Sequence, residues 1–302
     1  MSDLSALWPI KTSEVQTATM DSTIWNDIAM REDDIFICTY PKSGTTWMQQ
    51  IVSQILFQGE DDVDISARSP WIDQRIPREQ MLAWVEKVKG RRFLKSHVPL
   101  NCIKYSPSAK YINVARDGRD VAWSLYAHFR GGLFPWIKQM HDVAGSGHAP
   151  TRPTDPREFY LHWLQSDDGR FMPFFPHIRS WWEYRHLPNI KLVHYADLKA
   201  NLPGQIRDIA AFLNTPIDER WWPRLLERCS FEYMQANARK IMRLRETNAP
   251  GMADSFFNKG INRRWADVLS PEENAEYQAR ARRELGDDCG KWLGGGGTTA
   301  RS

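Results

Sequence analysis

Short apolar runs alternate along the chain with stretches in which apolar residues recur every third or fourth position. The runs are rich in Ile, Val and Phe, which is typical of buried β-strands, and they lie at 34–39, 92–95, 111–115 and 191–194. Helical patterns lie at 45–57, 120–129, 178–186 and 202–213. Strands that alternate with helices indicate a parallel sheet flanked by helices, so we predict an α/β fold.

Two segments interrupt this alternation. Residues 131–156 are dense in Gly and Pro, which predicts a long loop or lid rather than a linker between domains. The ending GGGGTTARS predicts a disordered tail over residues 294–302. We therefore expect a single α/β domain over residues 1–293, with about four or five parallel strands at its centre.

Composition and charge narrow the classes of function. With 302 residues and 42% apolar side chains, the chain can bury a large core, which excludes a disordered protein. Its 40 basic and 37 acidic side chains are too balanced for nucleic-acid binding through bulk charge, so any anion site must be local. The four cysteines form no CxxC pair, and no metal-ligand spacing is present. Neither a signal peptide nor a membrane-spanning apolar run is visible, so we expect a cytoplasmic protein without membrane insertion.

The first predicted strand leads into a loop that contains Lys42, Ser43, Gly44, Thr45 and Thr46, and a helix begins there. A helix N-terminus, unpaired backbone N–H groups and a lysine together suit one anion, so the loop predicts a phosphate cradle. It is not a Walker A loop, because GxxxxGK[ST] places the lysine after the second glycine. An ordinary turn with a threonine helix cap is the alternative.

The second predicted strand ends in a Lys-Ser-His run. Ligands of open α/β sheets bind at the carboxyl ends of the strands, so Lys95 and His97 can share a pocket with Lys42. A lone histidine in such a place is commonly structural, and that is the alternative for His97.

The third predicted strand is followed by Arg116, and Ser124 lies on the helix after it. The rigid fork of an arginine suits a second phosphate, and a serine hydroxyl can add a hydrogen bond. In the alternative interpretation Arg116 pairs with Asp117 or Asp120 and stabilises the turn.

These motifs together resemble the cytosolic-type sulfotransferases, the family that moves a sulfonate group from 3′-phosphoadenosine-5′-phosphosulfate (PAPS) to a hydroxyl or amine. The resemblance spans nearly the whole chain in the family's order. Its most specific string is TYPKSGTTW at 39–47. The other matching strings are RSPW at 68–71, FLKSHVP at 93–99, VARDGRDVAWSLYAHF at 114–129, HIRSWWE at 177–183, VHYADLK at 193–199, CSFEYM at 229–234 and FNKG at 257–260, with a tryptophan at 265.

The resemblance implies a fold like that of P-loop nucleotide kinases, PAPS as co-substrate and no metal. The loop from Lys42 to Thr46 would hold the 5′-phosphosulfate, and Arg116 and Ser124 would bind the 3′-phosphate. The other nucleotide-binding positions are Trp47, Tyr195 and Phe231 around the adenine, together with Asn258, Lys259 and Gly260. Core packing is the alternative for the three aromatic side chains.

One position departs from the family's pattern. The family has Arg-Lys-Gly before Gly-Asp-Trp, whereas this chain has Asn258-Lys259-Gly260 before Arg263-Arg264-Trp265. Asn258 can hydrogen-bond a phosphate but brings no charge. Lys259, Arg263 and Arg264 are the candidates to replace the missing cation.

Sulfonate transfer needs a base for the acceptor and cations for the charge that develops on the leaving phosphate. We assign the first role to His97 and the second to Lys42 and Lys95. The alternatives are a P-loop-type small-molecule kinase, which would need Mg²⁺ and Walker motifs, and a catalytically silent protein that binds adenine nucleotides.

The acceptor is expected to be a small molecule with an apolar or aromatic body, such as a phenol, an alcohol or a lipid-like hydroxyl. That expectation rests on a candidate apolar wall, whose members could equally be core residues. They are Trp71, Leu133, Phe134, Trp136, Met140, Phe159 and Trp163.

Overall fold

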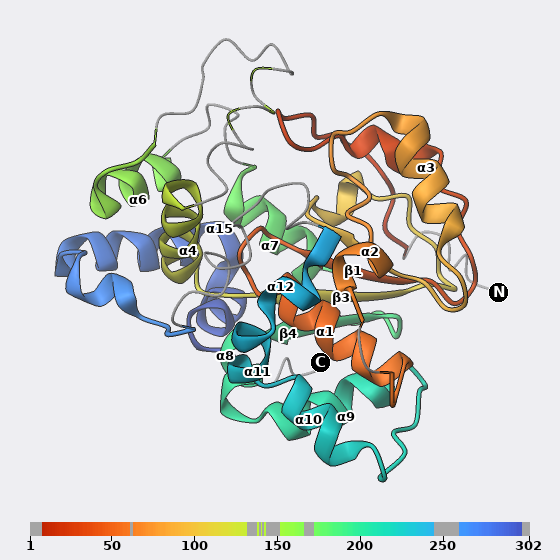
Figure 1. Ribbon diagram of the computed structural model, residues 1–302. Helices are drawn as coiled ribbons and strands as arrows, with labels where there is room; N and C mark the ends of the chain where they lie inside the picture. The colour runs from red at the N-terminus through yellow and green to blue at the C-terminus, as the bar shows by residue number, and fades with distance from the viewer. Residues whose placement is uncertain are drawn as a thin grey trace.

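The computed structural model describes residues 8–60, 63–131, 138, 140, 142, 152–165, 172–244 and 260–297. Its centre is a four-stranded parallel sheet in the order β2-β1-β3-β4 (Figure 1). The strands are β1 (Ile35–Thr39), β2 (Phe93–Ser96), β3 (Lys110–Ala115) and β4 (Ile190–His194). The predicted α/β fold and its four strands are confirmed, with boundaries that differ by one residue.

Alternate residues of β1, one of the two central strands, point to opposite faces of the sheet. Ile35 and Ile37 pack with α1 (Thr45–Leu56), while Phe36 and Cys38 pack on the other face with residues that precede the sheet. The first face is completed by α9 (Leu202–Phe212) and α10 (Trp222–Arg228), which lie against α1. Because both faces are covered, the strands read as continuous apolar runs in the sequence.

Helices on the other side form two groups. Contacts join α4 (Gly118–Arg130) to α6 (Pro156–Gln165), and α7 (Phe174–Trp182) to α15 (Pro271–Gly295). The shorter elements are η2 (Ser22–Asn26), α2 (Ile65–Arg68), α3 (Arg78–Lys87), η3 (Leu100–Cys102), α8 (Tyr195–Ala200), α11 (Phe231–Ala236), α12 (Ala238–Ile241) and η4 (Arg264–Asp267). No helix in the described ranges combines the length and the apolar character needed to span a bilayer.

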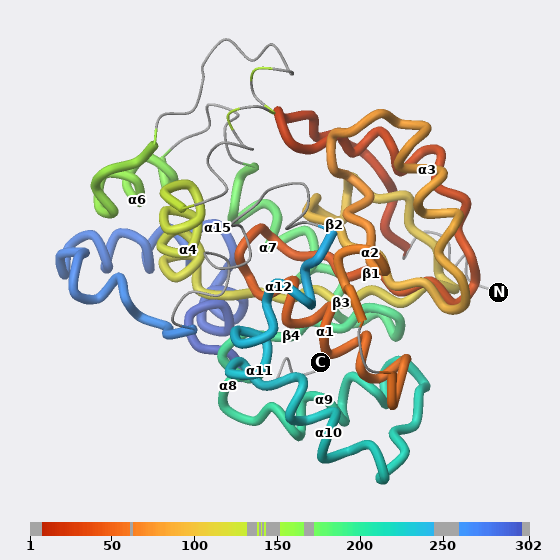
Figure 2. The backbone as a smooth tube through the Cα atoms, in the orientation of Figure 1, coloured from red at the N-terminus to blue at the C-terminus, as the bar shows by residue number. Residues whose placement is uncertain are grey.

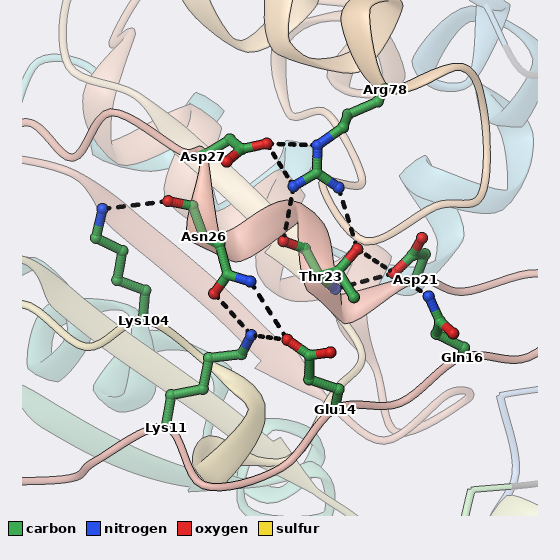
Figure 3. Close-up of polar contacts among 9 residues, drawn as sticks. All are labelled: Lys11, Glu14, Gln16, Asp21, Thr23, Asn26, Asp27, Arg78 and Lys104. Atoms are coloured by element: carbon green, nitrogen blue, oxygen red, sulfur yellow. Dashed lines mark hydrogen bonds and ion pairs between the residues drawn. The ribbon is translucent and has the colours of Figure 1, made fainter.

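The N-terminal segment runs alongside α3, as the red and orange parts of the tube in Figure 2 show. Polar side chains hold it in place (Figure 3): within the segment Lys11 Nζ donates to Oδ1 of Asn26 at 2.7 Å, and the guanidinium of Arg78, on α3, pairs with the Asp27 carboxylate. Such exposed pairs are individually weak. They nevertheless fix a segment whose backbone reaches the 70–75 loop, where the N–H of Asp21 donates to the carbonyl of Asp73 at 2.9 Å.

Two predicted boundaries are wrong. The helix expected over 178–186 is α7, which begins at Phe174 and ends at Trp182, four residues early at each end. It can begin there because Pro176 falls in the first turn, where its missing N–H costs no hydrogen bond. The tail expected from residue 294 starts too early: Gly295 is the last residue of α15, and the N–H of Gly297 donates to the Asp197 carboxylate at 3.0 Å. Residues 298–302 of that tail lie outside the described residues, as does most of the predicted 131–156 loop.

Candidate active site

Predicted site residues lie at or just after the carboxyl ends of all four strands, so the parallel sheet brings these residues to one edge. Direct contacts join them across neighbouring strands. The Arg116 guanidinium lies 4.2 Å from the centre of the Tyr195 ring, and its Nη1 donates to the carbonyl of Lys42 at 3.4 Å. The structure therefore places the loop after β1, the arginine after β3 and the tyrosine after β4 together.

The loop after β1 has a backbone shaped for close approach. Lys42 and Gly44 both have positive φ values, of 70° and 114°, and a Cβ on Gly44 would lie 2.9 Å from the Tyr195 ring. Gly44 is the N-cap of α1 and provides no side-chain cap, so the first N–H groups of the helix remain suited to an anion. The ordinary threonine cap considered above is therefore excluded. Nζ of Lys42 lies 3.3 Å from Nδ1 of His128 on α4.

In the described part of the chain, the loop after β1 and the end of β3 each have a buried polar atom without a hydrogen-bond partner. They are Oγ of Ser43, in the loop, and Nε of Arg116, at the end of β3. A buried unsatisfied donor costs about 1–3 kcal/mol. Their position beside the Gly44 helix N-terminus suits an anionic ligand that accepts hydrogen bonds from both.

Asp117 does not neutralise Arg116, contrary to one alternative above. Its carboxylate forms an ion pair with Arg119 at 2.5 Å, within the same turn. Asp120 is the acidic neighbour of Arg116, and burial raises the pKa of its carboxyl to about 6, although the positive charge of Arg116 acts in the opposite direction. Ser124, on α4, is half-buried.

Aromatic residues border the same loop. The Trp47 ring lies 5.4 Å from the Tyr195 ring, nearly edge-on, and its Nε1 donates to the carbonyl of Cys229 at 2.7 Å. Phe231 opens α11, and a Cβ on Gly260 would lie 2.8 Å from its ring. The three aromatic residues also contact the core, so packing accounts for part of their role. Asn258 and Lys259 lie outside the described residues.

The ring of His97 has a defined tautomer. Its Nδ1 lies 2.8 Å from the backbone carbonyl of Thr39, and a carbonyl oxygen can only accept a hydrogen bond. Nδ1 therefore carries the proton, and Nε2 of the neutral ring presents a lone pair. A hydroxyl pair supports the same ring, because Oγ1 of Thr39 lies 3.3 Å from Nδ1 and 2.5 Å from Oγ1 of Thr45.

The candidate apolar wall is only partly supported. Trp71 lies beside the site, with its ring 5.0 Å from that of His97 and 4.5 Å from Nζ of Lys95. Trp163 is instead a core residue, buried and bonded through Nε1 to the Tyr40 hydroxyl at 3.1 Å. Leu133, Phe134 and Trp136 lie outside the described residues.

Three residues at this edge were missed by the sequence reasoning: Asp73, His128 and Asn262. Asp73 follows the apolar Trp71-Ile72 pair, and an acidic residue at the end of an apolar run was the available signal. His128 and Asn262 had no such signal in the sequence. His128 contacts Lys42, and Asn262 contacts Arg116, across long sequence separations. The residues that the structure describes contain no group of three potential metal ligands.

Comparison with known proteins gives concordant results. Residues 32–289 match the family model described as the sulfotransferase domain. The chain is 27% identical over 304 residues to a glycolipid sulfotransferase of Mycobacterium bovis, covering 90% of this chain and 91% of that protein. It is 28% identical over 276 residues to dog sulfotransferase 1B1, covering 86% and 87%. Among solved structures, retinol dehydratase in complex with retinol and PAP (3′-phosphoadenosine 5′-phosphate) superposes with a TM-score of 0.70 at 25% identity. The superposition covers 88% of this chain and 84% of that one.

Proposed function

This chain belongs to the sulfotransferase family, and from that premise we propose that it moves a sulfonate group from PAPS to a hydroxyl or amine of a small apolar or aromatic acceptor, with His97 as the general base. The observation that carries the proposal is the 2.8 Å contact between Nδ1 of His97 and the carbonyl of Thr39. It puts the ring proton on Nδ1, so Nε2 is the nitrogen that would take the acceptor's proton, at the same sheet edge as the lysine-containing loop.

The residues at this edge fit PAPS. Ser43 Oγ, Arg116 Nε and the α1 N-terminus all offer hydrogen-bond donors to anionic oxygens. In the proposed complex, residues 42–46 hold the 5′-phosphosulfate, and Arg116 and Ser124 bind the 3′-phosphate. The aromatic side chains and the 258–260 segment enclose the adenosine part. PAPS supplies the activated sulfonate group.

The protein's own residues take up the acceptor's proton and neutralise the negative charge that develops during transfer. His97 takes the proton of the acceptor at Nε2 as the acceptor attacks. Lys42, in the loop after β1, and Lys95, over the Trp71 ring, offset the negative charge that develops on the leaving phosphate during transfer. Lys95 is 5% exposed, and the low dielectric of a buried position strengthens its attraction for that charge.

An apolar or aromatic acceptor is supported by Trp71. Its ring lies against both His97 and Lys95, so a flat or apolar acceptor body can pack on it while its hydroxyl faces the base. Of the similar proteins, one is named a glycolipid sulfotransferase, and another was solved in complex with retinol.

A screen of acceptors tests this proposal. The purified protein is incubated with PAPS and panels of phenols, apolar alcohols, amines and sugars, and PAP formation and acceptor mass are recorded. We expect turnover with members of the phenol or apolar alcohol panels. Turnover of sugars alone would contradict the acceptor class. Transfer from ATP with Mg²⁺, but not from PAPS, would favour the kinase. Binding of PAP without turnover of any panel would favour the silent nucleotide-binding protein.

A further inference from the structure

Residues 70–72 pair with β2, an edge strand of the sheet, and a turn from Trp71 to Gln74 follows. The N–H of Lys95 donates to the carbonyl of Pro70 at 2.9 Å, and the N–H of Ile72 donates to the carbonyl of Lys95 at 3.0 Å. Trp71 is thereby paired in parallel with Lys95. The next residue of the segment, Asp73, consequently lies beside the backbone of His97.

The Asp73 side chain is completely buried and turned toward the Ser96-His97 backbone. Its two carboxylate oxygens lie 3.0 and 3.3 Å from the backbone nitrogen of His97, which donates to them. From the other side, the Asp73 carbonyl accepts from the N–H of Asp21. The N-terminal segment therefore holds the backbone of Asp73, and the end of β2 holds its carboxyl.

Burial of this carboxylate is costly. Burial raises the pKa of Asp73 to about 6, while the His97 N–H and the positive charge of Lys95 act in the opposite direction. A neutral side chain could fill the same space without that cost. A carboxylate has a specific advantage here, because both of its oxygens face the N–H of His97 and both accept, whereas a side-chain amide would offer one accepting oxygen and one donating NH2 group.

We propose that Asp73 is the positioning residue of His97, an inference that rests on the proposed role of His97 as base. Asp73 fixes the backbone of the histidine, while the Thr39 carbonyl fixes its ring. The turn beyond is held by α7, where Oγ of Ser180 accepts from the N–H of Leu100 at 3.0 Å. With backbone and ring both held, Nε2 keeps one position relative to the loop after β1.

The test is a double-mutant cycle between Asp73→Asn and His97→Ala in the full chain. Misplacement of a reacting group by about 1 Å can cost about 10²-fold, so we expect Asp73→Asn to lower kcat about 10- to 100-fold. The affinity for PAP, measured by calorimetry, should stay within about 2-fold of wild type. In the His97→Ala background the same substitution should lower the residual rate by less than about 2-fold, because residues that act through one group are not additive.

A matched control separates positioning from loss of stability. Asp34 is equally buried, but its carboxylate pairs with Arg92 at the opposite end of β1. Asp34→Asn should lower the melting temperature and leave kcat within about 3-fold of wild type for the folded protein. A loss of kcat in Asp34→Asn as large as in Asp73→Asn would assign the effect to stability and overturn the proposal.

The remaining outcomes are distinct. An unchanged kcat in Asp73→Asn, or an equal loss in both backgrounds, would overturn the role of Asp73. An unchanged kcat in His97→Ala would instead remove His97 as the base, which is a failure of the proposed function. If Asp73→Asn does not fold, Asp73→Ala is the second variant, because it removes both accepting oxygens and leaves no polar side chain to bury. It should lower kcat several-fold only when His97 is present, and an unchanged kcat in that variant would overturn the proposal.

Discussion

Arg116 donates a hydrogen bond of 2.8 Å from Nη2 to Oδ1 of Asn262, and this bond joins the end of β3 to the segment in which the chain departs from its family's pattern. The next residue, Arg263, is anchored by its N–H, which donates to the carboxylate of Asp120 at 2.7 Å. The departing segment is therefore tied at two successive residues to the proposed 3′-phosphate site.

Arg263 is the strongest described candidate to replace the arginine missing at position 258. It is exposed and has a positive φ of 65°, at a position where the family has glycine. A non-glycine residue in this conformation costs about 1–2 kcal/mol, which is typical of a residue kept for function. The guanidinium of Arg264, in contrast, lies 5.0 Å from the centre of the Trp123 ring.

The first prediction is that Arg263→Gly weakens PAP binding and stabilises the protein. A charge-assisted bond to phosphate contributes about 1.5–3 kcal/mol, so the affinity should fall about 10- to 150-fold. Relief of the strained φ should raise the melting temperature by about 2–4 °C. Calorimetry and thermal unfolding measure the two effects.

Adenosine 5′-phosphosulfate, which lacks the 3′-phosphate, is the matched ligand, and its affinity should barely change. Arg264→Ala is the control variant and should affect PAP much less. If Lys259→Ala rather than Arg263→Gly changes the ratio of the two affinities, the replacement cation is Lys259. If neither does, and Arg116→Ala also leaves the ratio unchanged, the proposed 3′-phosphate site is misplaced.

The second prediction concerns the base. His97→Ala removes the nitrogen that accepts the proton of the acceptor, so kcat should fall about 10²-fold or more, while PAP affinity stays near wild type. Steady-state kinetics with an acceptor from the screen measures kcat, and calorimetry measures the affinity for PAP. The exposed His162, on α6, provides the control, and His162→Ala should retain normal turnover. Near-normal turnover in His97→Ala would exclude this histidine from the proton transfer.

The third prediction is that sulfonate transfer persists in excess EDTA, because the Lys42 ammonium supplies the charge that a divalent ion supplies to kinases. Lys42→Ala should lower kcat about 10²- to 10³-fold. Lys104→Ala, at the exposed N-terminal cluster of Figure 3, is the matched loss of a lysine and should have no effect on kcat. Loss of activity in EDTA, with recovery in Mg²⁺, would support the kinase alternative.

Local patterns predicted much of this molecule. Three strands were visible because they are almost fully buried on both faces, and β4 is partly buried but still mostly apolar. The loop from Lys42 to Thr46 was visible because all its candidate residues are contiguous. The boundary of α7 was misplaced because Pro176 was not recognised as a first-turn residue. The end of α15 was misplaced because glycines that disfavour a helix are held by the packing of Trp292 and Leu293 and by Asp197.

The positions of Asp73 and Asn262 could not be predicted in the same way. Asp73 meets His97 only because residues 70–72 pair with β2, and that pairing has no local signature. Asn262 meets Arg116 across 146 positions of the chain. Both are products of tertiary packing, which propensity and periodicity do not encode.

The last prediction uses His177, whose imidazole is completely buried on α7 with its ring 5.6 Å from that of Tyr40. Burial lowers its pKa to about 3, although backbone groups of His97 and Val98 act in the opposite direction. An imidazole in the unfolded chain titrates near its usual value of about 6.5. Between these two values the unfolded state binds more protons than the folded state, so the free energy of unfolding falls as the pH falls.

We therefore expect His177→Gln to be less stable than wild type at pH 7, because packing against Tyr40 is disturbed, but to lose less stability on acidification. One proton difference changes the free energy of unfolding by up to about 1.4 kcal/mol per pH unit, and the variant's decline between pH 6 and pH 4.5 should be shallower by about that slope. Urea unfolding at pH 7, 6, 5 and 4.5 measures the free energy of unfolding of both proteins. His186→Gln is the matched control, because that side chain is exposed, and it should decline as wild type does. Parallel pH profiles for His177→Gln and wild type would show that the His177 imidazole is not held neutral by the fold.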